Sequence, residues 1–188
     1  MKNIDRREFF RTAGSAALAM SAVGCARGSQ NNGADAEPAG EMTYRTNRHN
    51  GDKVSILGYG CMRWPMIQDA EGKDVIDQET TNRLVDYAIE HGVNYFDTAP
   101  VYLQGQSEAA TGAALKRYPR ESIYIATKLS NFKNHSRENS LLMYRKSFEN
   151  LQTEYIDYYL LHCLMTDNLD KAENFGVFRK LAEKKKTG

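Results

Sequence analysis

The chain has 188 residues, which is enough for one domain with a sizeable hydrophobic core. It is 41% hydrophobic and 26% charged, a composition typical of globular rather than disordered proteins. Its formal net charge of +1 gives no electrostatic reason to expect nucleic acid or an acidic membrane surface as a partner.

The first 25 residues are predicted to be a signal peptide. Arg6-Arg7 is followed by two phenylalanines and then by a short run of small and apolar residues, Thr12–Gly24. This run is too short to span a bilayer, since a spanning helix needs about 20 apolar residues. A basic start, an apolar centre and small residues near its end are typical of a secretory signal. The adjacent arginines resemble the bacterial twin-arginine (Tat) signal, so we expect export to the periplasm or to the outer side of the membrane.

Cys25 raises a second possibility for the end of this segment. Ala22-Val23-Gly24-Cys25 resembles a lipoprotein cleavage site, in which the cysteine carries the lipid, but Ala22 stands where leucine is usual. A membrane contact would then run only through the signal peptide or this lipid. Residues 26–41 are rich in Ala, Gly and Asn and predict a flexible linker. The other cysteines, Cys61 and Cys163, form no C-x-x-C and are expected to be buried small hydrophobic residues.

The body, residues 42–188, opens with a predicted β-hairpin. Met42–Arg45 and Lys53–Leu57 are β-prone runs, and Asn50-Gly51-Asp52 between them is a turn. Gly58–Met62 follows as a strand that ends in a loop closed by Trp64-Pro65.

Strands and helices then alternate. Helices are predicted from the Asp77 N-cap to His91-Gly92, over Ser107–Arg117, over Arg137–Leu151 and over Asn168–Lys186. Strands are predicted over Val93–Phe96, Ser122–Thr127 and Ile156–Leu161. This alternation predicts an α/β fold with a parallel sheet and crossover helices. Either a doubly wound sheet or a (β/α)8 TIM-type barrel begins in this way, and the absence of G-x-G-x-x-G after the first strand favours the barrel.

Three polar residues follow apolar runs at the ends of successive strands. They are Asp97, Lys128 and His162, spaced 31 and 34 residues apart, and Tyr102 lies in the loop after Asp97. In a βα barrel the chemistry takes place at the carboxyl ends of the strands. A single such residue could merely cap the next helix, but three of them and a nearby tyrosine predict a shared site.

The four side chains suit proton donation to a carbonyl oxygen. A phenol is a poor acid at neutral pH, and an ammonium beside it favours loss of its proton. Lys128 can provide that charge, Asp97 can hold Lys128 in place, and His162 can orient a substrate oxygen. No side chain can donate a hydride, so a nicotinamide cofactor is required.

These segments resemble the aldo/keto reductase superfamily from about Met42 to the carboxyl end. The resemblance rests on the following segments: Lys53–Trp64, Asn94–Ala99 with Tyr102, Gly105–Glu108 with Gly112 and Leu115, Ile123–Lys128, and Ser147–His162. It implies an oxidoreductase that uses NADP(H) rather than NAD(H) to reduce a small aldehyde or ketone, with Tyr102 as proton donor. Asp97 and the backbone of Gly60, Cys61 and Met62 would border the cofactor.

The chain is shorter than the family pattern requires. The family barrel has eight βα units, whereas this sequence supplies a hairpin and four units. The resemblance places the adenine and phosphate contacts in the last two units. We therefore expect residues 42–188 to be the N-terminal half of a barrel, a truncated product.

Two alternatives remain open at this point. A half barrel could be inactive, or act at most as a binding module, because the fold serves some relatives as a non-catalytic subunit. A metal-dependent barrel hydrolase could also use Asp97 and His162, but such enzymes usually carry a His-x-His pair on the first strand. Gly58–Met62 contains no histidine, and His49, His91 and His135 are predicted to be exposed, so we expect no metal site.

Overall fold

The computed structural model describes residues 41–163 and Arg179. The predicted signal peptide and the predicted linker as far as residue 40 lie outside the described residues. So does the predicted helix Asn168–Lys186, apart from Arg179, which is helical. No helix in the described part of the chain is long and apolar enough to cross a bilayer.

The first described element is the predicted hairpin. Strands β1 (Tyr44–Thr46) and β2 (Lys53–Ser55) pair in antiparallel fashion. Their connection is closed by the N–H of Gly51, which donates to the carbonyl of Asn47 at 2.8 Å, with Gly51 at φ +82°. This left-handed conformation favours glycine, so the turn predicted here is confirmed.

A second hairpin was not predicted. Strands β4 (Met66–Gln68) and β5 (Asp74–Ile76) pair between Trp64-Pro65 and Asp77, where the sequence analysis assigns no element. The carboxylate of Asp69 accepts hydrogen bonds from the backbone N–H groups of Glu71 and Lys73, at 3.1 and 2.8 Å, and so fixes the turn. Strands of three residues are too short for a period-2 pattern to stand out, which is why they were missed.

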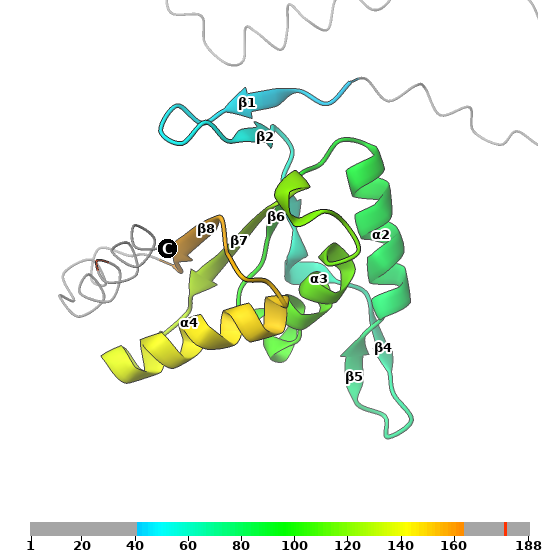
Figure 1. Ribbon diagram of the computed structural model, residues 1–188. Coiled ribbons are helices and arrows are strands. Elements are labelled where there is room, and N and C mark those ends of the chain that lie inside the picture. Colours follow the sequence, from blue (N-terminus) through cyan, green and yellow to red (C-terminus); the bar gives the residue numbers. More distant parts are fainter. Residues whose placement is uncertain (1–40, 164–178, 180–188) are drawn as a thin grey trace, which may run out of the picture. The chain divides into compact units, whose positions relative to one another are not determined.

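The central element is a parallel sheet with the strand order β3-β6-β7-β8 (Figure 1). Its strands are β3 (Tyr59–Gly60), β6 (Tyr95–Asp97), β7 (Tyr124–Leu129) and β8 (Tyr158–Leu161). Strands that are consecutive in the repeat are neighbours in the sheet. The α/β class and the parallel sheet predicted from the alternation are therefore confirmed.

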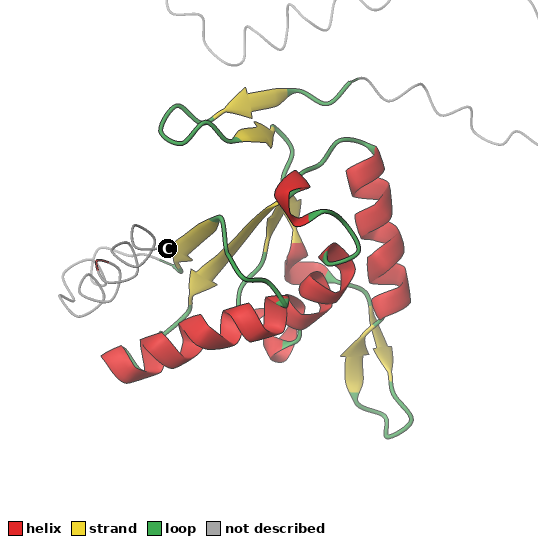
Figure 2. Cartoon of the chain, in the orientation of Figure 1, coloured by secondary structure: helices red, strands yellow, loops and turns green. Residues whose placement is uncertain are grey.

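Three α-helices connect these strands (Figure 2). They are α2 (Gln78–Glu90), α3 (Ser107–Leu115) and α4 (Arg137–Leu151), and α3 packs against both of the others. Asp77 caps α2 by accepting a hydrogen bond from the N–H of Thr80 at 3.0 Å, as predicted. Three short 3-10 segments complete the described part of the chain: η1 (Cys61–Arg63), η2 (Tyr102–Gly105) and η3 (Arg120–Ser122).

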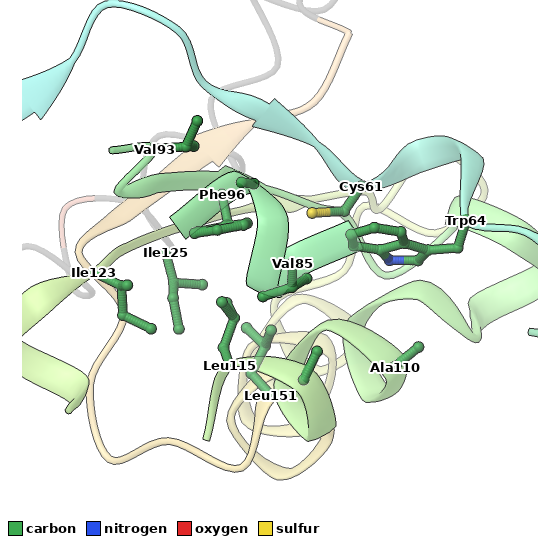
Figure 3. Packing of buried hydrophobic residues seen from close by; sticks show 12 residues of the cluster. Cys61, Trp64, Val85, Val93, Phe96, Ala110, Leu115, Ile123, Ile125 and Leu151 are labelled. Atoms are coloured by element: carbon green, nitrogen blue, oxygen red, sulfur yellow. The ribbon is translucent and has the colours of Figure 1, made fainter. Parts of the chain in front are cut away.

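The core lies between the sheet and these helices (Figure 3). Phe96 and Ile125 point from the sheet toward Val85, Leu115 and Leu151 of the three helices, and all five side chains are buried. Cys61 is buried in the same cluster, as predicted. Cys163 is exposed, so the prediction of its burial was wrong, because the residue lies in the turn beyond the end of β8.

Side chains alternate between the two faces of the sheet, and this alternation separates the core from the site. Phe96 and Ile125 face the helices, so their neighbours Tyr95, Asp97 and Tyr124 face the opposite side. Near the amino ends of the strands this opposite face carries an aromatic cluster, in which the Tyr95 and Tyr158 rings are 5.5 Å apart. The polar residues predicted to form a site lie at the other end of the same face.

Candidate active site

The register of the sheet brings the predicted strand-end residues to one edge. Asp97 is the last residue of β6 and His162 directly follows β8. Lys128 was predicted to follow its strand, but β7 continues to Leu129, because Leu129 still pairs with Leu161. Lys128 is therefore the penultimate residue of β7, on the same face as Asp97.

Lys128 is held by two oxygens at this edge. Its Nζ atom lies 2.5 Å from Oδ1 of Asp97 and donates to the carbonyl of Thr98 at 2.7 Å. The Lys128 side chain is 12% exposed, and the Asp97 side chain is 31% exposed. The ammonium is thus largely removed from water but is compensated by a carboxylate and a carbonyl, which hold it in position.

Tyr102 reaches the same place from the loop after β6. Nζ of Lys128 lies 4.8 Å from the centroid of the Tyr102 ring, a cation–π contact. The chain turns sharply just beyond this tyrosine, since Leu103 and Gln104 have φ values of 49° and 56°. Non-glycine residues seldom adopt this left-handed region, so the loop holds local strain directly beside Tyr102.

His162 completes the group from the end of β8. Its ring meets the Tyr102 ring edge-on, with centroids 5.5 Å apart and an interplanar angle of 83°. Burial lowers the pKa of His162 from its ordinary value of 6.5; the Lys128 ammonium lowers it further, and Asp97 acts in the opposite direction. The neutral imidazole is therefore favoured near pH 7.

The structure thus brings together all four residues singled out in the sequence: Asp97, Tyr102, Lys128 and His162. An acid and an ammonium are paired beside a phenol, and a neutral imidazole packs against the same phenol. Such an arrangement can donate a proton from the phenol and a hydrogen bond from the imidazole to one substrate oxygen.

The residues predicted to border a cofactor lie beside this group. Gly60 of β3 pairs with Asp97 of β6, so residues 60–62 reach the same edge of the sheet. Met62 is 44% exposed, whereas the Cys61 side chain is fully buried. Burial raises the pKa of the Cys61 thiol to about 12, so the side chain acts as a hydrophobic residue. Cys61 is 0% exposed as a whole residue and its carbonyl accepts from Ser107, so Gly60 and Met62 are the two residues of this segment with exposed surface.

Sequence reasoning missed a buried hydroxyl network behind the site. The Thr98 and Ser107 hydroxyls are 2.9 Å apart, and Ser107 Oγ donates to the carbonyl of Cys61 at 2.7 Å. This network connects Thr98, whose carbonyl accepts from Lys128, to the start of α3 and to Cys61 after β3. Serine and threonine are common at the ends of strands and the starts of helices, so no local pattern marks Thr98 or Ser107.

Glu108 lies in the first turn of α3. The structure buries it completely: its Oε1 accepts from the Thr127 hydroxyl at 2.7 Å and its Oε2 accepts from the Asn150 amide at 3.1 Å. Glu108 therefore ties α3 and α4 to β7, one residue before Lys128.

The histidines outside the site differ in exposure. His49 and His91 are exposed, as predicted, but His135 is only partly exposed, because its Nδ1 atom is buried just before α4. Within residues 41–163 and at Arg179, no group of three His, Cys, Asp or Glu side chains could hold a metal ion.

Comparison with known proteins connects this geometry to one family. The model of the aldo/keto reductase family matches residues 57–188. A Glycine max protein named "Probable aldo-keto reductase 1" is 35% identical over 144 residues, which are 72% of this chain and 40% of that protein. The chain thus spans less than half the length of this relative.

Solved structures show the same likeness. The holo form of an aldo-keto reductase from Bacillus halodurans has a TM-score of 0.62 and 32% identity, covering 76% of this chain and 47% of that one. An aldo-keto reductase from Klebsiella pneumoniae in complex with NADPH has a TM-score of 0.58 and 26% identity, again with 76% and 47% coverage. The predicted TIM-barrel type of fold is confirmed by these neighbours.

Proposed function

The chain belongs to the aldo/keto reductase family, and we propose that the protein containing it uses NADP(H) to reduce an aldehyde or a ketone to an alcohol. The observation that carries this proposal is the position of Lys128. Its ammonium lies between the Asp97 carboxylate and the face of the Tyr102 ring, against which His162 packs edge-on. If these strand ends were merely solvated, there would be no reason for the Asp97–Lys128 ion pair to pack on a loop tyrosine that also contacts His162.

In this proposal Tyr102 gives its proton to the carbonyl oxygen as the carbon is reduced. The phenolate that remains is stabilised by the Lys128 ammonium, and Asp97 keeps that ammonium in place. His162 donates a hydrogen bond to the same oxygen and so orients the carbonyl. NADPH, when bound, would supply the hydride, which no side chain can provide.

The residues present fit a nicotinamide group at this edge. Gly60 is exposed, and a Cβ placed on it would meet nothing within 4 Å, so the space in front of the strand end is open beside Asp97. Asp97 keeps part of its side chain exposed while it holds Lys128. We propose that Asp97 and the segment of residues 60–62 would border the cofactor, with Gly60 and Met62 presenting its exposed surface. The complex of the Klebsiella pneumoniae neighbour with NADPH supports NADP(H) as the cofactor.

The test is made on the natural protein that contains this chain. NADPH consumption is followed with a panel of aliphatic and aromatic aldehydes and ketones, and binding of NADPH is measured separately by fluorescence titration. We expect carbonyl-dependent NADPH consumption. Binding of NADPH without turnover of any carbonyl would support a non-catalytic binding module instead.

We further propose that residues 1–25 direct export through the twin-arginine route, because Arg6-Arg7 precedes an apolar run too short to span a bilayer. In a bacterial host, cell fractionation should find the protein outside the cytoplasm. The double variant Arg6→Lys and Arg7→Lys should stay inside. If Cys25 carries a lipid, Cys25→Ala should move the exported protein from the membrane to the soluble fraction. Wild-type protein retained in the cytoplasm would contradict export.

A further inference from the structure

Ser130 contacts the ring of His162 through a short hydrogen bond. Ser130 directly follows β7, and His162 directly follows the neighbouring strand β8. Ser130 Oγ lies 2.6 Å from Nδ1 of His162, and the serine is only 4% exposed. The N–H of His162 also donates to the carbonyl of Leu129 at 3.2 Å, so the two strand ends are joined by backbone as well as by side chains.

Two further contacts fix the orientation of the imidazole. The Tyr102 ring meets it edge-on at 5.5 Å, and the Phe132 ring lies 5.2 Å away at an interplanar angle of 53°. With Ser130 on Nδ1 and two aromatic rings packed against it, the imidazole has little freedom to flip. What remains variable is which nitrogen carries the proton.

A neutral imidazole has one N–H and one lone pair. If the proton were on Nδ1, Nε2 would present its lone pair to a substrate oxygen and repel it. If the proton is on Nε2, that nitrogen can donate to the oxygen, and Nδ1 must accept a hydrogen bond. The Ser130 hydroxyl is placed to donate that bond.

We propose that Ser130 is a positioning residue, whose hydroxyl donates to Nδ1 and holds His162 in the tautomer protonated on Nε2. This inference rests on the proposed function, because that function requires a hydrogen-bond donor at Nε2. It goes beyond the four predicted residues, since Ser130 acts only through His162.

The direct test is the imidazole ¹⁵N spectrum of the protein labelled at histidine. His162→Asn identifies the His162 signals among those of the other histidines. At neutral pH the wild-type ring should show a protonated Nε2 and an unprotonated, hydrogen-bonded Nδ1. Ser130→Ala should lose this bias and show a mixture of tautomers, and Ser130→Thr, which keeps the hydroxyl, should restore it.

Two outcomes would overturn the proposal. The first is a wild-type His162 ring protonated on Nδ1, a result that does not depend on whether Ser130→Ala folds. The second is a folded Ser130→Ala protein with the wild-type tautomer.

The kinetic readout separates this proposal from the proposed function. Ser130→Ala should lower kcat/KM by roughly ten- to a hundredfold, the scale known for losing the hydrogen-bond partner behind a metal-ligating histidine, and Ser130→Thr should recover most of it. NADPH binding should not change. If wild-type protein shows the expected tautomer but turns over no carbonyl, the proposed function fails while the assignment of Ser130 to the tautomer stands.

Discussion

The ammonium of Lys128 lies 2.5 Å from the carboxylate of Asp97, although 31 positions separate the two residues in the sequence. Parallel pairing of β6 with β7 sets Asp97 opposite Ala126, and Lys128 comes two residues later on the same face. The ion pair is therefore a direct product of strand register. It is also the contact that fixes a cation against the Tyr102 ring.

Replacing Lys128 tests the electrostatic part of the account. Lys128→Met keeps much of the side-chain length but removes the charge, so the phenolate of Tyr102 would lose its counter-charge. We expect the turnover of the natural protein to fall by about 10²-fold or more. Lys116→Met is the matched control, because Lys116 is an exposed lysine that bonds to Gln152 away from the site. Equal activity of the two variants would count against the role of Lys128.

Gly112 controls the contact between α3 and α4. A Cβ added there would lie 2.5 Å from the carbonyl oxygen of Leu151, and backbone atoms cannot move aside cheaply. Gly112→Ala should therefore lower the free energy of unfolding by about 1–3 kcal/mol or more, measured by urea denaturation. Gly60→Ala should change it by less than about 0.5 kcal/mol, because its Cβ would meet open space. Similar midpoints for the two variants would contradict this packing.

Glu108 should stabilise the fold through its two buried hydrogen bonds. Glu108→Ala leaves the Thr127 hydroxyl and the Asn150 amide without their acceptor, which we expect to cost about 1–3 kcal/mol of unfolding free energy. Glu108→Gln keeps one acceptor oxygen and should lose less. An unchanged unfolding midpoint in Glu108→Ala would show that these bonds contribute nothing measurable.

The lowered pKa of His162 predicts a pH dependence of stability. The folded state binds its proton less readily than the unfolded state, in which the pKa is near the ordinary 6.5. The contribution of neutral His162 to the stability of the fold is therefore fully present above pH 6.5. This contribution is lost as the pH falls from 6.5 toward the lower pKa of the folded state. Urea denaturation between pH 7 and about pH 5 should show a smaller loss of stability in His162→Asn than in wild type. Parallel curves would mean that His162 does not titrate differently on folding.

Much of the fold follows from local pattern. Helix α4 begins and ends where the sequence predicts, at Arg137 and Leu151, because Ser136 caps it and Gln152 takes a left-handed conformation at its end. Strand spacing alone predicts that Asp97, Lys128 and His162 lie at one edge of the sheet, because the carboxyl ends of parallel strands lie on the same side. Tyr102 was found because only a short loop separates it from Asp97.

Other features depend on tertiary contacts that no local pattern encodes. Ser130 was missed because its partner, His162, is 32 residues away and its position follows from the pairing of β7 with β8. The burial of Glu108 was not predicted, because its hydrogen-bond partners come from β7 and α4. The β4–β5 hairpin was missed because two strands of three residues carry too little periodicity.

The central claim is that Tyr102 donates the proton in carbonyl reduction, and one comparison tests it most directly. Tyr102→Phe and Tyr87→Phe each remove a single phenolic hydroxyl; Tyr87 is a 64% exposed residue of α2. NADPH consumption with a carbonyl substrate should fall by about 10²–10⁴-fold in Tyr102→Phe, with NADPH binding retained, and should not change in Tyr87→Phe. Full turnover by Tyr102→Phe would contradict the account.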